Sequence, residues 1–406
     1  MSVALISTFS LLVMVVRAIV DVKVGILHHW PQHDTFIGTF YVFPAAQIAF
    51  ETVAGRLETG QYQNFNMSYI STDECCTRPV RSTGALAASM YYDHGVDAFL
   101  GPSKSMEMAA VADMAAYWNL PVITAAASSF HLADKARFAT LTRTFPKLAS
   151  VSKYLAEIFQ QHQWTSCVVL RGFETTRFFE HSVPSSIAAA LQDAGVTVIE
   201  VFANNYSTLG QALEEAATWS SVIFLCTSPV RDIMGHAYRL GYKAESHTFL
   251  YWYPLEKESW HTSSQFQSLS KEETEAMKAL VVLRPELPKS DEAYQQFQRK
   301  LRERQQALYG KTQVEDNVVA AATHDAVLMY ADVINEIVAE GGDVRDGRSV
   351  TKKMWNRTFE GLTGTFKIGN DGDRLMVNQM LLMTGDYPGH FNVTFTHDEA
   401  ADSLRV

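Results

Sequence analysis

The chain has 406 residues, of which 47% are apolar and 19% charged, and its net charge is −10. This balance is typical of globular proteins and argues against a disordered or fibrous chain. The acidic charge argues against a nucleic-acid binder that relies on overall basic charge. At about 150 residues per domain, the length predicts two or three domains.

The first 20 residues form an apolar leader. Leu5 to Val20 is almost continuously apolar, and the small residues Val16 and Ala18 precede a candidate cleavage point. The run is shorter than the roughly 20 residues of a comfortable membrane span, and no later apolar run reaches that length. We therefore expect residues 1–20 to be a cleaved secretory signal, in preference to an uncleaved anchor or a core segment.

Four sequons agree with secretion. Each matches the Asn-x-Ser/Thr acceptor pattern for N-glycosylation. The acceptor residues are Asn66, Asn205, Asn356 and Asn392.

The chain has four cysteines, Cys75, Cys76, Cys167 and Cys226. A bridge between the adjacent Cys75 and Cys76 would be strained, and Cys167 and Cys226 lie in apolar runs typical of buried thiols. The pairing stays open. No Cys-x-x-Cys pair occurs, which argues against a structural zinc site.

After the leader, short apolar runs alternate with segments of helical pattern. The spacing is typical of βαβ units, which implies a parallel sheet with right-handed crossovers. Predicted strands are 22–27, 65–70, 96–100 and 121–124, and predicted helices are 45–54, 84–92 and 105–118.

A second α/β series begins near residue 150. Val151, Tyr154, Leu155 and Ile158 fall on one helical face, and Ser150 is placed to cap that helix. Predicted strands follow at 167–170, 196–202, 222–226 and 248–252, with helices at 185–193, 209–218 and 230–240. We expect two doubly wound lobes whose ligands meet the carboxyl ends of the strands.

The last third of the chain predicts a charged helix at 290–309, an apolar helix at 318–338 and a hairpin at 369–372. Basic residues gather on the charged helix, but Glu292 and Glu303 dilute them. This mixture favours a solvated face over a nucleic-acid site.

Catalytic patterns are missing from the sequence. It contains no Gly-x-Ser-x-Gly elbow, no His-Glu-x-x-His and no dinucleotide glycines after the first strand. Residues 28–34 hold three histidines and an aspartate, but adjacent side chains on an extended segment point apart, so we expect no metal site there. The acidic residues at 370–373 lack the calcium-loop pattern and fit a hairpin turn. Binding is therefore favoured over catalysis.

Two turns at predicted strand ends are candidates for ligand contact. Residues 101–105 join a strand to a helix, and their backbone N–H groups could hold a small anion, unless this is an ordinary tight turn. Ser128 and Ser129 lie in a turn of small residues after the fourth strand. Their hydroxyls could hold a polar ligand at the lip of a cleft, or one of them could cap the next helix.

Specific motifs gather in the carboxyl-terminal third. Residues 323–330, 341–347 and the Trp355-centred stretch 354–361 closely resemble the ectodomains of natriuretic peptide receptors. The likeness continues through 362–374 and is supported earlier at 100–102, 118–121, 141–144 and 222–229. It covers roughly residues 22–385.

The resemblance implies the type I periplasmic-binding-protein fold: an α/β chain with two doubly wound parallel-sheet lobes, joined by a hinge that the chain crosses several times. Its approximate boundaries are 21–146 and 281–361 for lobe 1, and 147–280 and 362–396 for lobe 2. Family members are extracellular hormone-binding regions, most of them in receptor guanylate cyclases, and they dimerise through the ectodomain.

The resemblance also implies what to expect of activity and location. The membrane span and the cyclase domain of such receptors follow the ectodomain, so we expect no enzymatic activity in this chain and anchoring only through a segment that it lacks. The expected location is the outer side of the plasma membrane in a full-length receptor, or outside the cell if the protein ends at Val406.

Several positions depart from the family. Both family disulfides are expected to be absent, since Lys104 stands where one partner cysteine would be, and residues 178–180 stand near the other. The family's chloride site, held by a hydroxyl and backbone N–H groups, corresponds to Thr72, Ser103 and Lys104, and chloride is the one cofactor that the resemblance implies.

The peptide-contacting surface departs as well. A tyrosine and an arginine that contact hormone in the family correspond to Met106 and Asp113, a reversal of charge at the second position. The leading hypothesis is thus a receptor ectodomain for a different peptide or other extracellular ligand. The runner-up is a binder of amino-acid-like molecules through Ser128 and Ser129, and the third hypothesis is a secreted decoy or clearance form.

Overall fold

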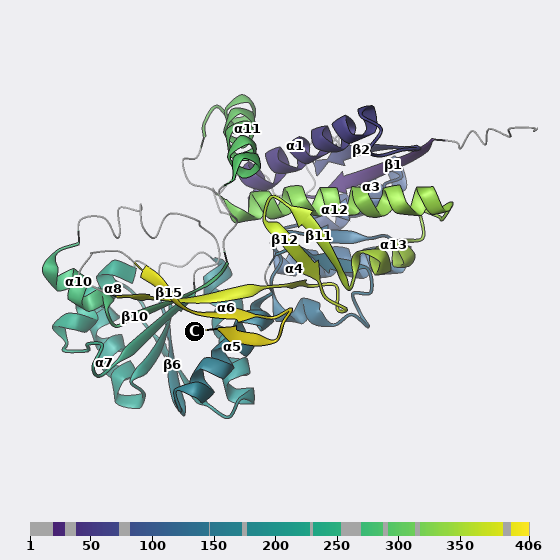
Figure 1. The fold of residues 1–406 in the computed structure, drawn as a ribbon. Helices are drawn as coiled ribbons and strands as arrows, with labels where there is room; N and C mark the ends of the chain where they lie inside the picture. The colour runs from purple at the N-terminus through teal and green to yellow at the C-terminus, as the bar shows by residue number, and fades with distance from the viewer. Residues whose placement is uncertain are drawn as a thin grey trace, which may run out of the picture.

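The computed structural model describes residues 19–28, 38–72, 82–145, 147–172, 177–227, 230–252, 269–286, 291–312, 317–384 and 391–405. Nearly all of the expected signal sequence, together with Cys75 and Cys76, lies outside these residues. Two lobes are visible in Figure 1, one containing the amino-terminal strands and the other the teal middle of the chain.

Lobe 1 is built on a five-stranded parallel sheet of order β2-β1-β3-β4-β5, the order of a doubly wound fold. The four predicted strands all form, whereas β5 was not predicted. The strands are β1 (Val20–Ile26), β2 (Phe65–Ser71), β3 (Ala98–Leu100), β4 (Val122–Thr124) and β5 (Leu141–Arg143).

Helices cover both faces of this sheet because its strands are buried on both sides. Val24 and Ile123 point to the face with α1 and α12, and Phe99 and Val122 point to the face with α3 and α4. The helices of this lobe are α1 (Thr39–Glu58), α3 (Thr83–His94), α4 (Ser105–Trp118), the 3-10 helix η1 (Phe130–Ala133), α11 (Glu292–Tyr309), α12 (Val318–Glu340) and α13 (Gly347–Met354).

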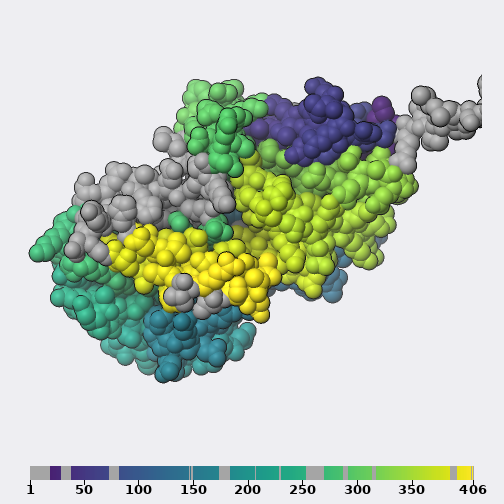
Figure 2. Space-filling view, viewed as in Figure 1, coloured from purple at the N-terminus to yellow at the C-terminus, as the bar shows by residue number. Residues whose placement is uncertain are grey.

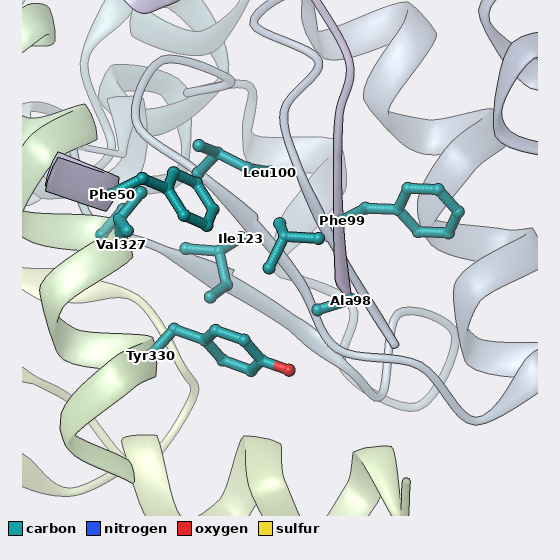
Figure 3. A pocket seen from close by; sticks show the side chains of 9 residues that line it. Phe50, Ala98, Phe99, Leu100, Ile123, Val327 and Tyr330 are labelled. Atoms are coloured by element: carbon teal, nitrogen blue, oxygen red, sulfur yellow. The ribbon is translucent and has the colours of Figure 1, made fainter. Parts of the chain in front are cut away.

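A small cavity lies inside lobe 1, between the sheet and helices α1 and α12 (Figure 3). Its volume is about 10 Å³, near the lower limit for one water molecule, and its lining is apolar except for the Tyr330 hydroxyl. That hydroxyl makes no hydrogen bond among the described residues, and burial raises the pKa of Tyr330. The cavity is a packing gap, too small and too apolar for a ligand.

Lobe 2 repeats the strand order of lobe 1, as β7-β6-β8-β9-β10, and extends it with three antiparallel strands. The predicted strands again form, but β10 and the added strands were not predicted. The strands are β6 (Ser166–Arg171), β7 (Thr197–Phe202), β8 (Val222–Cys226), β9 (Thr248–Trp252), β10 (Leu280–Pro285), β14 (Val377–Met383), β15 (Phe391–Asp398) and β16 (Ser403–Arg405).

Helices α5 and α6 pack on one face of this sheet, and α7, α8 and α10 pack on the other. The predicted apolar face of α5 is buried, but the helix begins at Leu148, so Ser150 lies in its first turn and is not the cap. The helices are α5 (Leu148–Gln161), α6 (Arg177–Asp193), η2 (Tyr206–Thr208), α7 (Leu209–Trp219), α8 (Val230–Arg239) and α10 (Lys271–Met277).

A three-stranded antiparallel sheet, β11 (Arg357–Gly361), β12 (Gly364–Ile368) and β13 (Arg374–Leu375), packs its Phe359 and Phe366 into the core of lobe 1. The predicted hairpin at 369–372 joins β12 to β13. Figure 2 shows the C-terminal residues (yellow) lying across lobe 2 and meeting the yellow-green residues of lobe 1.

The chain crosses between the lobes after β5, after β10 and between β13 and β14. Phe145, Glu286 and Met376, one from each crossing, line the same small pocket, so the three crossings lie together. The predicted boundaries shift accordingly. β10 pairs with β9 in lobe 2, which contradicts a return to lobe 1 at residue 281, and residues 362–375 stay with lobe 1. Sequence periodicity does not reveal which sheet a buried strand joins.

Among the described residues, none of the helices is both long enough and apolar enough to cross a membrane.

Candidate ligand-binding site

Three neighbouring turns meet at the carboxyl edge of the sheet in lobe 1. β1, β3 and β4 end level with one another, because Ile26 pairs with Leu100 and Leu100 pairs with Ile123. The turns that follow are residues 27–28, 101–105 and 125–129. Ligands of doubly wound sheets bind at this edge, so both turns singled out in the sequence lie where a site is expected.

The turn after β3 requires glycine at its first position. Gly101 has a φ of +83°, and a Cβ atom there would lie 2.3 Å from the carbonyl oxygen of Leu27. The Gly101 N–H donates to the Ile123 carbonyl at 2.8 Å, and Thr124 Oγ1 donates to the Pro102 carbonyl at 3.1 Å. These contacts bind the turns after β1, β3 and β4 into one surface.

Thr72, Ser103 and Lys104, where the sequence predicts an anion site, lie at this edge. Thr72 follows β2, and Ser103 and Lys104 follow β3, with β1 between those two strands. Thr72 Oγ1 donates to the Ile26 carbonyl at 3.2 Å and accepts from the His28 N–H at 3.1 Å. Lys104 precedes α4 as its N-cap residue, and its Nζ lies 3.7 Å from Glu107 Oε1.

Ser128 and Ser129 are both buried, with 1% and 7% of their surfaces exposed. The Ser129 N–H donates to Ser105 Oγ at 3.2 Å, and its carbonyl accepts from Arg143 Nη1 at 2.7 Å. Ser128 Oγ has no hydrogen-bond partner among the described residues. A buried hydroxyl without a partner is costly, so this group is one that a ligand's polar atom would satisfy.

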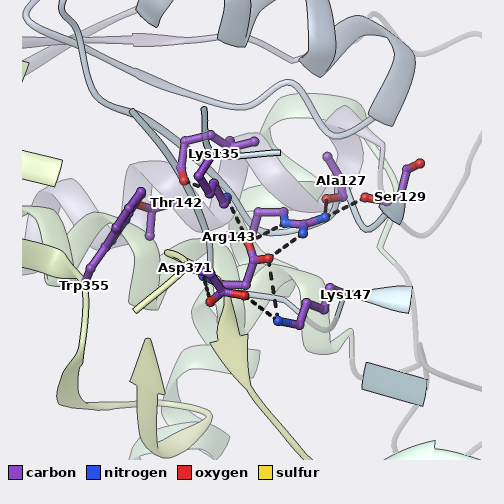
Figure 4. A network of polar contacts seen from close by, with 10 residues as sticks. Ala127, Ser129, Lys135, Thr142, Arg143, Lys147, Trp355 and Asp371 are labelled. Atoms are coloured by element: carbon purple, nitrogen blue, oxygen red, sulfur yellow. Dashed lines mark hydrogen bonds and ion pairs between the residues drawn. The ribbon is translucent and has the colours of Figure 1, made fainter. Parts of the chain in front are cut away.

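A cluster of charged residues lies behind this turn, and we call it the hinge cluster (Figure 4). Arg143, at the end of β5, donates from Nε and Nη2 to the two carboxylate oxygens of Asp373, each at 2.6 Å. Lys135 Nζ also contacts Asp373, at 3.1 Å, and Lys147 Nζ contacts Asp371 at 2.7 Å. The acidic residues of the hairpin turn thus pair with cations.

The hinge cluster holds more positive than negative side chains. Burial alone would raise the pKa of Asp373, but hydrogen bonds from Arg143 and the charges of Arg143, Lys135 and Lys147 outweigh it, so the pKa lies below its usual value. Burial lowers the pKa of Lys135. Three cations therefore surround two carboxylates immediately beneath the turn that carries Ser128.

The motif residues of the carboxyl-terminal third gather around the same cluster. Trp355 Nε1 donates to Thr142 Oγ1 at 2.9 Å, and a Cβ atom on Gly372 would lie 2.3 Å from the Trp355 ring. Arg374 donates to Thr363 Oγ1 at 2.8 Å and to the carbonyl of Thr144 at 3.4 Å. The sequence revealed these motifs, but not that they meet.

Other residues singled out in the sequence lie elsewhere. Met106 is 90% exposed on α4, and Asp113, on the same helix, accepts two hydrogen bonds from Arg137, at 2.8 and 2.6 Å. All four sequon asparagines are exposed.

The two cysteines of the described residues are buried, as the sequence suggested. Cys167 and Cys226 are unpaired thiols, and burial raises the pKa of Cys167 to about 12. His28 is buried and stacks on Phe43 at 4.6 Å, whereas residues 29–37 lie outside the described part of the chain.

Comparison with known proteins identifies the family. Residues 42–386 match the family described as the receptor family ligand binding region. The chain belongs to this family. Atrial natriuretic peptide receptor 3 of Bos taurus is 25% identical over 391 residues, which cover 90% of this chain and 70% of that receptor. Atrial natriuretic peptide receptor 2 of Bos taurus is 26% identical over 361 residues, which cover 82% of this chain and 33% of that receptor.

Solved structures confirm the predicted fold of this receptor ligand-binding region. The leucine-binding protein LivK of Thermotoga maritima superposes with a TM-score of 0.59 at 18% identity, over 94% of this chain and 100% of its own. A second neighbour is a branched-chain amino acid ABC transporter periplasmic ligand-binding protein of Burkholderia xenovorans LB400. Its TM-score is 0.64 at 14% identity, over 93% of this chain and 96% of its own. These neighbours are periplasmic binding proteins.

Proposed function

We propose that this chain is the ligand-sensing ectodomain of a receptor that resembles natriuretic peptide receptors and receptor guanylate cyclases. The observation that carries this proposal is the match of residues 42–386 to a receptor ligand-binding family, together with receptor relatives along most of the chain. The chain would act by binding an extracellular peptide or other ligand, and cyclase activity would belong to a separate domain.

We expect the ligand to be bound through contacts other than those that bind a natriuretic peptide in the family. The two positions that correspond to hormone contacts carry Met106, an exposed apolar side chain, and Asp113, whose charge is already paired with Arg137. An acidic group on a peptide would meet a carboxylate where the family offers a guanidinium. We therefore expect a ligand that does not depend on these contacts.

The test is direct binding by calorimetry, with fractionated peptide extracts and with a natriuretic peptide. We expect saturable binding from a peptide fraction and none from the natriuretic peptide. Peptide fractions that give no signal while amino acids do would contradict the peptide-receptor proposal. If the natriuretic peptide instead binds tightly, and if Met106→Ala does not change that affinity, the argument from the altered contacts is wrong.

A small-molecule ligand is the second candidate, and the partnerless Ser128 hydroxyl favours it. Such a ligand would contact the turns at 101–105 and 125–129 in the cleft. We expect an amino-acid panel to raise the melting temperature only if this second candidate is right, and Ser128→Ala or Ser129→Ala to abolish the rise. Ser221→Ala, at an exposed serine of lobe 2, is the control.

We also propose an anion, chloride, near Thr72, Ser103 and Lys104. The turn at 103–104 brings the amino terminus of α4 to the sheet edge, and helix amino termini favour anions. Replacing chloride by a large organic anion should lower the melting temperature of the wild type, and Thr72→Val should remove that dependence. A melting temperature that is indifferent to the anion would count against the site.

Extracellular location and a homodimer complete the proposal. The four exposed sequon asparagines support a secretory route. Exposed apolar side chains on α3 and α4, namely Tyr92, Met106 and Tyr117, are 71%, 90% and 87% accessible and offer a surface for a second copy.

A further inference from the structure

A second group of polar side chains lies in lobe 2, on elements other than those that form the candidate ligand-binding site. Glu157 comes from helix α5, His397 from strand β15, and Asp402 from the turn between β15 and β16. One nitrogen of His397 and one oxygen of each carboxylate all lie within 4.8 Å of one another. Figure 1 shows the C-terminal strands (yellow) beside α5.

His397 is held rigidly at the centre of this group. It is 1% exposed, it sits within a strand paired on both sides, and its ring stacks on Tyr154 of α5 at 5.5 Å and an angle of 13°. Neither ring nitrogen makes a hydrogen bond among the described residues. Its Nε2 lies 3.4 Å from Glu157 Oε2. A buried imidazole without hydrogen bonds is unusual, and a ligand to one of its nitrogens would resolve the deficit.

The carboxylates can approach this fixed nitrogen. The Glu157 side chain is 33% exposed and that of Asp402 is 77% exposed, so both can adjust without disturbing the core. Lys153 currently occupies part of the space, with its Nζ 2.6 Å from Asp402 Oδ1, and its own side chain is 54% exposed. Lys153 therefore neutralises the charge of Asp402.

We propose that Glu157, His397 and Asp402 bind one Zn²⁺ ion. One imidazole nitrogen and two carboxylate oxygens are ligands typical of zinc, with water in the remaining position. The nitrogen ligand disfavours Ca²⁺ and Mg²⁺, which take oxygen ligands. To bind the ion, Asp402 would release Lys153 and turn its carboxylate toward His397 and Glu157.

The ion would connect segments that are far apart in the chain. It would tie α5, the first helix after the hinge, to the two outermost strands of the lobe 2 sheet. Since the ion binds the folded arrangement of the three ligands and not the unfolded chain, zinc in excess should raise the melting temperature by about 5 °C.

The test uses the full chain, stripped with a chelator and titrated with ZnCl₂ alone. We expect uptake of one Zn²⁺ per chain by calorimetry, a rise in melting temperature, and no comparable response to CaCl₂ or MgCl₂. Glu157→Gln, at a half-buried side chain, and Asp402→Asn, at an exposed one, should each weaken zinc binding about tenfold or more while the apo protein stays folded. Lys153→Gln should strengthen it, because the competing cation is gone.

Glu215→Gln, on an exposed face of α7 across the sheet, is the matched control and should bind zinc as the wild type does. Co²⁺ should give visible d–d absorption in the wild type and lose it in Glu157→Gln. The proposal is overturned if the wild type takes up no zinc. It is equally overturned if Glu157→Gln and Asp402→Asn bind zinc as the wild type does, because the ion would then lie elsewhere.

Discussion

At the scale of single residues, Asp373 makes more ion pairs than any other side chain in the described part of the chain. It receives two hydrogen bonds from Arg143 and a contact from Lys135, and no part of its side chain is exposed. Removing one partner of a buried pair leaves a charge that neither water nor protein compensates. The same pair joins β5 to the turn before β13, so its loss would also loosen the hinge.

We predict that Arg143→Met lowers the free energy of unfolding by about 3–5 kcal/mol, measured by urea denaturation. Arg137→Met is the matched control, because its pair with Asp113 is bidentate but exposed, and it should change stability little. The double variant Arg143→Met, Asp373→Asn should recover part of the loss. Equal losses in Arg143→Met and Arg137→Met would contradict the argument from burial.

The stability that Asp373 contributes should depend on pH with a definite sign. Because its pKa in the folded protein lies below the usual 3.8, the contribution is fully present above pH 3.8 and is lost as the pH falls through the lower, folded value. The stability difference between wild type and Asp373→Asn should therefore be large at pH 7 and shrink in acid. A difference that stays constant between pH 7 and pH 3 would contradict this prediction.

At the scale of elements, Asp325 shows why the motif residues occur together. This buried carboxylate on α12 accepts from the N–H groups of Leu362 and Thr363, at 2.7 and 2.9 Å, and so holds the turn between β11 and β12. A Cβ atom on Gly361 would lie 2.4 Å from the Asp325 carboxyl carbon. These motif residues therefore attach helix α12 to the hairpin of β11 and β12, which is a structural role and not a ligand contact.

We predict that Asp325→Ala lowers the free energy of unfolding by about 2–4 kcal/mol, since two half-buried N–H groups lose a charged acceptor. Glu340→Gln, at the exposed end of α12, should leave stability nearly unchanged. Thermal and urea unfolding measure both. If binding of the cognate ligand were lost in Asp325→Ala without any loss of stability, this residue would have to be reassigned to the ligand site.

At the scale of the whole molecule, two lobes with their own cores meet at three crossings, an arrangement suited to opening and closing around a ligand. The proposed dimer surface lies on helices α3 and α4 of lobe 1. We predict that Met106→Glu combined with Tyr117→Glu shifts the protein from dimer to monomer in sedimentation velocity, because both exposed apolar side chains become charged.

Leu308→Glu, at a 41% exposed leucine on α11, is the control for that experiment and should leave the dimer intact. A dimer that survives both substitutions on α4 would place the contact on a different surface.

The sequence predicted the alternation of strands and helices, the two lobes, the buried face of α5 and the family. These features follow from local periodicity and from motifs that are contiguous in the chain. The sequence did not predict β5, β10 or the sheet that β10 joins. Two of the three residues of Leu141–Arg143 are polar, so this strand lacks the apolar run that reveals β3 and β4. A strand that is apolar on both faces, such as β10, gives no sign of the sheet that it joins.

The tertiary structure alone brought distant residues into contact. Arg143 contacts Asp373, which lies 230 positions later in the chain. Glu157 of α5 contacts His397 of β15. Neither spacing matches a local motif, which is why sequence reasoning did not bring these residues together. Local sequence determined which elements form in this protein, whereas the order of strands in each sheet decided which side chains became neighbours.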